Sequence, residues 1–187
     1  VKLARSDPRA RRALQEEVDI LWDLQGRYGI PELEGLLYRH GSLRGFVTRY
    51  VTGETLDRRL DRGPLAPWVV PVLATSLCRA VLAMLDGGVV HRDLKPGNIH
   101  CSLSWDARIL DFGLARRSAE ASAPTDLSGT LAYASPEQLA GNPLTAKSDL
   151  FSLGVVLYEV ATGQPFFPRE RTTFSSFLAL RRGRLRS

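Results

Sequence analysis

Residues 91–98 read His-Arg-Asp-Leu-Lys-Pro-Gly-Asn, and this stretch decides how the rest of the chain is interpreted. Seven specified positions in a row occur by chance on the order of once in a billion windows, if all residue types are equally common. The stretch brings a carboxylate (Asp93), a lysine (Lys95) and an amide (Asn98) into one short segment. Short apolar runs surround it, so we expect a strand–loop–strand arrangement over Val89–Asp111.

A second motif, Asp111-Phe112-Gly113, follows shortly after the first. By itself it is a weak signal, because any such tripeptide could form a turn. Its position gives it weight, since it comes directly after the apolar pair Ile109-Leu110, which is typical of a buried strand.

Together the two motifs suit phosphoryl transfer. That reaction needs metal ions to neutralise the charge of a phosphate and a group that aligns the attacking hydroxyl. Magnesium prefers oxygen ligands. Asp93 offers an orienting carboxylate, Asn98 and Asp111 offer two oxygen ligands, and Lys95 offers a positive point charge.

The composition excludes several classes of protein. In 187 residues, 44% are hydrophobic and 24% charged, which is typical of a globular domain and not of a disordered, collagenous or disulfide-rich chain. The two cysteines, Cys78 and Cys101, fit a reducing compartment. The net charge of +5 comes from scattered arginines, which favours solvated faces over a nucleic-acid surface. The longest apolar run, 69–85, is a poor membrane span because Pro71 and Arg79 interrupt it.

The two ends of the sequence indicate a fragment of a longer protein. The chain begins at Val1 without an initiator methionine or a signal peptide. It stops in the arginine-rich segment 181–187 without a helix cap.

Hydrophobic periodicity predicts an α+β organisation. We expect helices at Arg11–Gln25, Pro67–Leu85 and Ser148–Ala161, short strands at Leu36–Tyr38 and Gly45–Val51, and a long loop at Arg116–Thr130. The first part of the chain is therefore strand-rich around one helix and the remainder is mainly helical, with a seam near Val51–Glu54.

With these motifs in place, the chain resembles a protein kinase catalytic domain of the serine/threonine type, in the style of the eukaryotic-like kinases of bacteria. The resemblance covers nearly the whole chain. Residues 91–98 match the catalytic loop, 111–113 the metal-binding turn, 129–137 the end of the activation segment, and 149–154 the start of the central helix.

The resemblance implies a kinase-like two-lobe α+β fold. Residues 1–52 would form part of a small strand-rich N-lobe, and residues 53–187 a larger, mainly helical C-lobe. The strands of the glycine-rich loop and the last helices of the family would lie outside the chain, so we expect this fragment to be poorly active on its own.

The resemblance also implies roles for the motif residues. Asp93 would orient the substrate hydroxyl, Lys95 would steady the γ-phosphate, and Asn98 and Asp111 would hold magnesium. Asp149 would accept backbone amides of the catalytic loop, the alternative being a simple helix N-cap. If the first four were merely turn-capping polar residues, both motifs would have to coincide by chance.

Lys2 is the candidate for the phosphate-gripping lysine of the small lobe, because Val1-Lys2-Leu3 is similar to the end of the strand that carries it. Its acidic partner should be Glu17, which has apolar residues three, four and seven positions later; Glu16 fits less well. The alternative is a frayed terminal lysine.

The linker between the lobes would present backbone groups to adenine. It is expected to consist of the small gatekeeper Thr48 followed by Arg49, Tyr50 and Val51. Glu54 is either a ribose-binding carboxylate or a solvated surface residue. His100 stands where the family usually has an apolar residue beneath the adenine, and a stacked imidazole could replace it.

Regulation is expected in the activation segment. Arg92 precedes Asp93, and in kinases with this pair the arginine often binds a phosphate on that segment. Thr125 and Ser128 are the expected phosphorylation sites, with an unmodified loop as the alternative, and Thr130 would contact Asp93 and Lys95. Gly97 stands where some relatives have a glutamate that reads basic substrates, so no preference for arginine-flanked sites is implied.

We therefore expect an ATP-dependent serine/threonine protein kinase that uses ATP and Mg²⁺ and acts on protein substrates. No nucleic-acid partner and no membrane segment are expected within the chain, and the catalytic domain should be cytoplasmic. The alternatives are a pseudokinase that serves as a binding or scaffold module, and a small-molecule phosphotransferase. The four motif residues and the activation segment argue against both.

Overall fold

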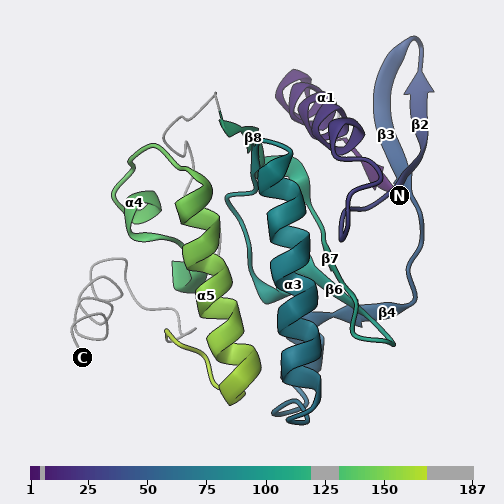
Figure 1. The fold of residues 1–187 in the computed structure, drawn as a ribbon. Coiled ribbons are helices and arrows are strands. Elements are labelled where there is room, and N and C mark those ends of the chain that lie inside the picture. Colours follow the sequence, from purple (N-terminus) through teal and green to yellow (C-terminus); the bar gives the residue numbers. More distant parts are fainter. Residues whose placement is uncertain (5–6, 119–130, 168–187) are drawn as a thin grey trace.

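A three-stranded antiparallel sheet and one long helix form the N-terminal part of the chain (Figure 1). The computed structural model describes residues 1–4, 7–118 and 131–167. The sheet has the strand order β1-β3-β2, built from β1 (Lys2–Leu3), β2 (Leu33–Arg39) and β3 (Ser42–Thr48). Helix α1 (Pro8–Asp23) packs against β3.

Local sequence explains where α1 begins and which face it buries. The carboxylate of Asp7 accepts the amide of Ala10 at 2.8 Å, and Pro8 occupies the first turn, where its missing N–H is not needed. Leu14, Val18 and Leu21 recur at helical spacing and are all buried.

The hairpin between β2 and β3 has a two-residue loop. Arg39 and Ser42 are paired, and His40 and Gly41 between them both have positive φ, 51° and 72°. Two successive positive φ values match the twist of the flanking strands, which is why a short hairpin forms here.

The C-terminal part is mainly helical and carries the catalytic motifs. In chain order it contains β4 (Gly53–Thr55), α2 (Leu56–Leu60), α3 (Val69–Asp86), β5 (Val89–Val90), the 3₁₀ turn η1 (Pro96–Asn98), β6 (Ile99–Ser102), β7 (Ala107–Ile109), the 3₁₀ turn η2 (Phe112–Leu114), β8 (Arg116–Arg117), the 3₁₀ turn η4 (Leu131–Tyr133), α4 (Pro136–Leu139) and α5 (Ala146–Thr162). Strands β4, β6 and β7 form a second sheet, and β5 pairs with β8.

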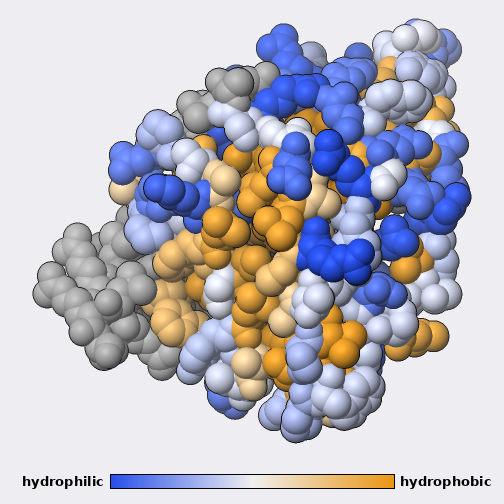
Figure 2. Space-filling model, in the orientation of Figure 1, coloured by the Kyte–Doolittle hydropathy of each residue, from blue (hydrophilic) through white to orange (hydrophobic). Residues whose placement is uncertain are grey.

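Helices α3 and α5 lie side by side and form the centre of this part (Figure 1). Leu73, Leu77 and Met84 of α3 are fully buried, as is Val156 of α5. Apolar side chains also gather on the surface over these two helices (Figure 2). Among the described residues, α3 is the one helix long and apolar enough to cross a membrane, a test that the buried core helix of a soluble protein also passes.

All three predicted helices form with shifted ends, and α5 is followed by Gly163, which has φ 67°. The loop predicted over Arg116–Thr130 lies mostly outside the described residues, and its first two residues form β8. The strand predicted over 45–51 was wrong at both ends, because β3 begins at the hairpin turn and stops at Thr48. The short helices α2 and α4 were not predicted, although Ser135 followed by Pro136 is a sequence signal for the start of α4.

Candidate active site

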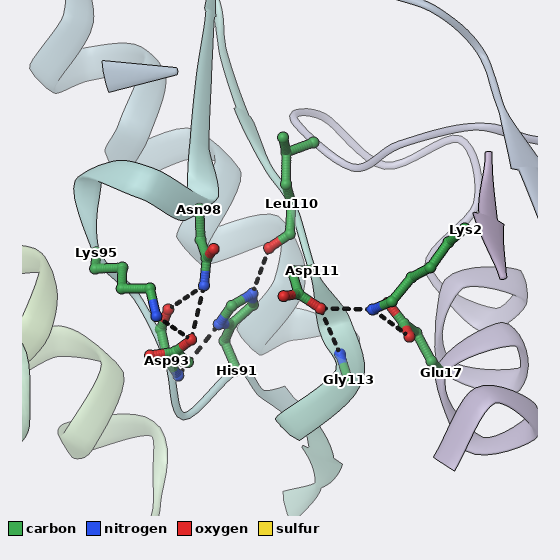
Figure 3. Close-up of polar contacts among 9 residues, drawn as sticks. All are labelled: Lys2, Glu17, His91, Asp93, Lys95, Asn98, Leu110, Asp111 and Gly113. Carbon is green, nitrogen blue, oxygen red and sulfur yellow. Dashed lines mark hydrogen bonds and ion pairs between the residues drawn. The ribbon is translucent and has the colours of Figure 1, made fainter. Parts of the chain in front are cut away.

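The loop between β5 and η1 holds Asp93, Lys95 and Asn98 together (Figure 3). The Oδ2 atom of Asp93 accepts the ammonium of Lys95 at 2.7 Å and the Asn98 amide at 2.8 Å. The same Nδ2 of Asn98 donates to the backbone carbonyl of Asp93 at 2.9 Å. The side chains of Asp93 and Lys95 are 18% and 23% exposed, so this carboxylate is held in one orientation while remaining accessible.

Asp149 of α5 holds this loop through two hydrogen bonds to its backbone. Its carboxylate accepts the amide of His91 at 2.6 Å and that of Arg92 at 2.9 Å. Arg92 has φ 71°, a conformation that non-glycine residues adopt only when their surroundings hold them in it. Burial raises the pKa of Asp149, and the two amides oppose that rise. The expected contact with the catalytic loop is present, and the alternative of an N-cap is wrong because Thr145 caps α5.

His91 links the catalytic loop to the strand that leads to Asp111 (Figure 3). Its Nδ1 accepts the backbone amide of Asp93 at 3.3 Å, so this nitrogen carries no proton. Its Nε2 then carries the proton and donates to the carbonyl of Leu110 at 3.0 Å. The ring is fully buried and lies edge-on to Phe112, with 5.0 Å between centroids. The sequence alone did not predict this role for His91.

Lys2, Glu17 and Asp111 form a second cluster, drawn from three different segments (Figure 3). The Nζ of Lys2 on β1 lies 2.7 Å from Glu17 of α1 and 2.6 Å from Asp111 Oδ1. Asp111 has φ 60°, and the same oxygen accepts the amide of Gly113 at 3.4 Å. The sequence favoured Glu17 over Glu16 as the partner of Lys2, and the structure brings Glu17 to it.

The pKa values of this cluster follow from burial and from the cation at its centre. Burial lowers the pKa of Lys2, but its hydrogen bonds to Asp111 and Glu17 outweigh that effect and leave it raised. Burial, together with the nearby charge of Asp111, leaves the pKa of Glu17 raised despite the opposing effect of Lys2. Burial also raises the pKa of Asp111, but there Lys2 outweighs it and leaves the pKa below its usual value. Asp111 is therefore the stronger acid of the two.

A cleft adjoins the cluster of Lys2, Glu17 and Asp111. One pocket of about 300 Å³ includes Lys2, Glu17 and Asp111 in its lining. A second, of about 460 Å³, is lined by linker residues together with Glu34, Val47, His100 and Arg108. The two pockets share Val1, Pro31, Thr48 and Leu110, so the cleft continues past the side chain of Thr48.

The linker lines this second pocket. Thr48, Arg49, Tyr50 and Val51 all belong to its lining. The amide of Arg49 donates to the Glu32 carbonyl at 2.9 Å, and its guanidinium pairs with Glu32 at 2.6 Å and Glu34 at 3.2 Å. Within the described part of the chain, the carbonyl of Arg49 and the amide of Val51 make no hydrogen bond. These two backbone groups are among those that the linker leaves available for hydrogen bonding.

His100 lines the cleft, whereas Glu54 does not. His100 lines the second pocket, and its Nδ1 is buried without a hydrogen-bond partner among the described residues. Burial and the nearby Arg108 lower its pKa. Glu54 lines neither this pocket nor the one beside Lys2; its side chain is 17% exposed and paired with Arg59 at 2.8 Å and with Arg62. The structure therefore does not bring Glu54 to the cleft, where a ribose-binding carboxylate is expected, and pairs it with two arginines instead.

The predicted regulatory residues are only partly described. Thr125, Ser128 and Thr130 lie outside the described residues. Arg92 lies in the catalytic loop, where its carbonyl accepts the side-chain amide of Gln138 at 3.0 Å. This contact ties α4 to the loop and could not be found from sequence spacing, because it joins residues 46 positions apart.

These features define a class. A two-lobe α+β fold carries two lysine–carboxylate clusters, one of which lines a cleft, and this is the arrangement of a phosphotransferase of the kinase type. A family model described as "Protein kinase domain" matches residues 1–183. The chain belongs to the protein kinase domain family.

Several curated proteins are similar to it. The serine/threonine-protein kinase PknB of Mycobacterium leprae is 40% identical over 131 residues, covering 68% of this chain and 21% of that protein. PknB of Mycobacterium tuberculosis H37Rv is 39% identical over 132 residues, with the same coverage of 68% and 21%. A probable PknB of Corynebacterium glutamicum is 39% identical over 114 residues, covering 59% and 18%. The chain thus spans about a fifth of the length of these relatives.

Proposed function

We propose that this chain is the catalytic part of an ATP-dependent serine/threonine protein kinase, which transfers the γ-phosphate of Mg·ATP to hydroxyls of protein substrates. One observation carries the proposal. Lys2 binds Asp111, the carbonyl of the adjacent Leu110 binds His91, and His91 binds the amide of Asp93. The phosphate-binding and hydroxyl-binding groups therefore belong to one connected framework, as in-line transfer requires.

In this proposal Asp93 orients the substrate hydroxyl and accepts its proton as the oxygen bonds to the γ-phosphorus. The bond from that phosphorus to the β,γ-bridging oxygen breaks, and ADP leaves with the electron pair. Lys95, 2.7 Å from Asp93, balances the charge that develops on the transferring phosphoryl group. Lys2 binds the more distant phosphates, with Glu17 fixing its position.

The donor set fits magnesium. The Nδ2 of Asn98 donates two hydrogen bonds to Asp93, and the amide oxygen of Asn98 points away from Asp93 (Figure 3). Asp111 has a lowered pKa, so it is ionised at neutral pH. Asn98 and Asp111 would hold the ion, which when bound neutralises phosphate charge. The described residues contain no group of three or more His, Cys, Asp or Glu that could hold a metal by themselves, which suits a site completed by phosphates and water.

The nucleotide base would lie in the 460 Å³ pocket. The carbonyl of Arg49 and the amide of Val51 form an acceptor–donor pair complementary to an adenine edge. Thr48 would limit the depth of the pocket, with Tyr50 beside it, and the His100 ring would lie beneath the base. Glu54 is not assigned to nucleotide binding, because its carboxylate pairs with Arg59 and Arg62.

The test uses two substitutions with different expected effects. In the complete kinase domain, Asp93→Asn should reduce phosphorylation of a serine peptide by at least about 100-fold and leave Mg·ATP affinity nearly unchanged, since only proton acceptance and alignment are lost. Asp111→Asn should weaken Mg·ATP binding as well, because a charged ligand is lost. Equal phosphate transfer by wild type and Asp93→Asn would favour a pseudokinase whose measured activity comes from a contaminant.

We also propose that activation-segment phosphorylation regulates this enzyme. A phosphate on Thr125 or Ser128 adds roughly −1.5 to −2 charges, enough to bind Arg92 through charge-assisted hydrogen bonds, while Thr130 contacts Asp93 and Lys95. Mass spectrometry after incubation with Mg·ATP should find phosphate on Thr125 or Ser128. Activity equal to wild type in the double alanine variant would exclude this switch.

Two further assignments belong to the proposal. The lobe boundary falls between residues 52 and 53, because the first sheet ends at Thr48 and the second begins at Gly53. The catalytic domain acts in the cytoplasm, where ATP is available, which the free thiols of Cys78 and Cys101 suit.

A further inference from the structure

Asp57 and Gly97 lie against each other at the edge of the catalytic loop. Asp57 belongs to α2 and Gly97 to η1, two elements in contact. A Cβ atom placed on Gly97 would lie 3.3 Å from the Asp57 Oδ2 and 3.9 Å from its Cγ, and no other described residue outside the loop neighbours comes within 4 Å. The carboxylate of Asp57 therefore occupies the space that a side chain at position 97 would enter.

The charge of this carboxylate is not neutralised by the described part of the protein. Asp57 Oδ1 accepts the amide of Arg58 at 2.8 Å, and no cationic side chain among the described residues forms an ion pair with it. The nearby guanidiniums of Arg59 and Arg62 are both engaged by Glu54. Asp57 is half-buried on a helix that packs on η1, so part of its surface remains exposed beside the catalytic loop.

The negative charge of Asp57 lies beside the loop that carries the reacting groups, where a side chain of a bound peptide can reach it. Gly97 directly precedes Asn98, whose amide binds the Asp93 carboxylate at 2.8 Å. A peptide whose hydroxyl reaches Asp93 must therefore pass close to Gly97. Because Gly97 has no side chain, a long cationic side chain of that peptide could reach the Asp57 carboxylate across it.

We propose that Asp57 is a specificity-determining residue that binds a lysine or arginine side chain of the protein substrate, close to the phosphorylated residue. The proposal rests on the kinase function proposed above and names a substrate class for it. From sequence alone, Gly97 implies no preference for arginine-flanked sites. The proposal departs from that implication, because α2 supplies a carboxylate beside Gly97, where position 97 itself lacks one.

A peptide scan tests the proposal. The substrates are serine peptides in which a single arginine is moved through each flanking position, each compared with the peptide that has glutamine at the same position. At one or two adjacent positions the wild type should show a ratio of kcat/KM for arginine over glutamine of about 3 to 10, the range expected for a half-exposed charge-assisted pair. The gain should appear mainly as a lower KM and should shrink with added salt.

The matched variants are Asp57→Asn and Asp61→Asn. Both remove one negative charge from the same short segment, but Asp61 is exposed at the end of α2 and away from Gly97. Asp57→Asn should bring the arginine-to-glutamine ratio to unity, and Asp61→Asn should keep it. Because the ratio compares two peptides on one enzyme, a partly misfolded variant does not change it.

The outcomes separate the two proposals. A flat arginine scan in an active wild type, a ratio that survives Asp57→Asn, or one lost equally in Asp61→Asn would each overturn the role of Asp57 and leave the kinase function standing. Failure of the full-length wild-type protein to phosphorylate any peptide, while Asp93→Asn in the same protein behaves identically, would overturn the kinase function and this inference with it.

Discussion

Substituting Asp149 by asparagine should destabilise the protein and impair catalysis together. Asp149 is 1% exposed, and its two oxygens accept the amides of His91 and Arg92 at 2.6 and 2.9 Å. Asparagine has nearly the same shape but only one acceptor oxygen, so one buried amide loses its partner. Equilibrium urea unfolding and peptide phosphorylation measure the two consequences.

The magnitude follows from these two hydrogen bonds. Losing a bond to a buried charged acceptor costs roughly 1.5–3 kcal/mol, and converting the other to a neutral bond costs roughly a further 0.5–1 kcal/mol. We therefore expect the free energy of unfolding to fall by about 2–4 kcal/mol, or about 5–15 °C in Tm for a chain of this size. The positive φ of Arg92 relaxes once its amide is released, which displaces Asp93 next to it. A displacement of about 1 Å is enough to lower kcat about 100-fold.

Asp86→Asn is the control, because Asp86 is an exposed aspartate at the end of α3. Its unfolding free energy should stay within about 0.5 kcal/mol of wild type. If Asp149→Asn is as stable as Asp86→Asn, the carboxylate does not hold the loop, and the reasoning from these two hydrogen bonds is refuted.

Three further predictions concern the cleft and the core. Glu17→Gln should lower kcat/KM for ATP by about tenfold or more, because Lys2 loses a charged partner 2.7 Å away. The effect on the free energy of unfolding should be smaller than the effect on ATP kinetics, because burial already disfavours the charged form of Glu17 and raises its pKa. His100→Leu should remove part of the acid sensitivity of folding. The lowered pKa keeps His100 neutral in the folded state while the unfolded chain takes up a proton below about pH 6.5, so wild-type stability falls as the pH falls through that range and the leucine variant lacks this contribution. Cys101, fully buried with its pKa raised to about 12, should resist maleimide in the folded protein, while the less buried Cys78 reacts.

Each of these predictions has its own control. Glu16→Gln, on the same helix but facing Arg116, should leave ATP kinetics near wild type; if it matches Glu17→Gln, the effect is not specific to the Lys2 pair. For His100, identical pH profiles of unfolding in wild type and variant would contradict the prediction. For the cysteines, labelling in denaturant should modify both thiols, and equal labelling rates in the folded protein would contradict the burial of Cys101.

Local sequence was sufficient for much of the fold. The 3.6-residue spacing of Leu14, Val18 and Leu21 predicted the buried face of α1. Glycine and proline marked element ends, as Gly163 does for α5. These signals act within one or two turns of chain. The ends of β3 were missed because they depend on a hairpin turn and on pairing with β2, which the strand's own residues do not specify.

The residues of the candidate site also fall into two groups, those that local sequence identifies and those that only the fold brings together. Two short motifs and one helix pattern were enough to select Asp93, Lys95, Asn98, Asp111 and Glu17, because each belongs to a segment whose spacing can be recognised. The sequence also indicated that Asp149 would contact the catalytic loop, 58 residues away, but only through the resemblance to protein kinases.

Only the tertiary structure decided how charges meet across distant segments. It placed Glu54 between two arginines and away from the cleft, ordered the pKa values of Glu17 and Asp111 around one lysine, and set Asp57 against Gly97. The energy of a charge depends on burial and on partners within a few ångströms. Those partners come from separate helices and strands, and no local pattern in the chain encodes their distance.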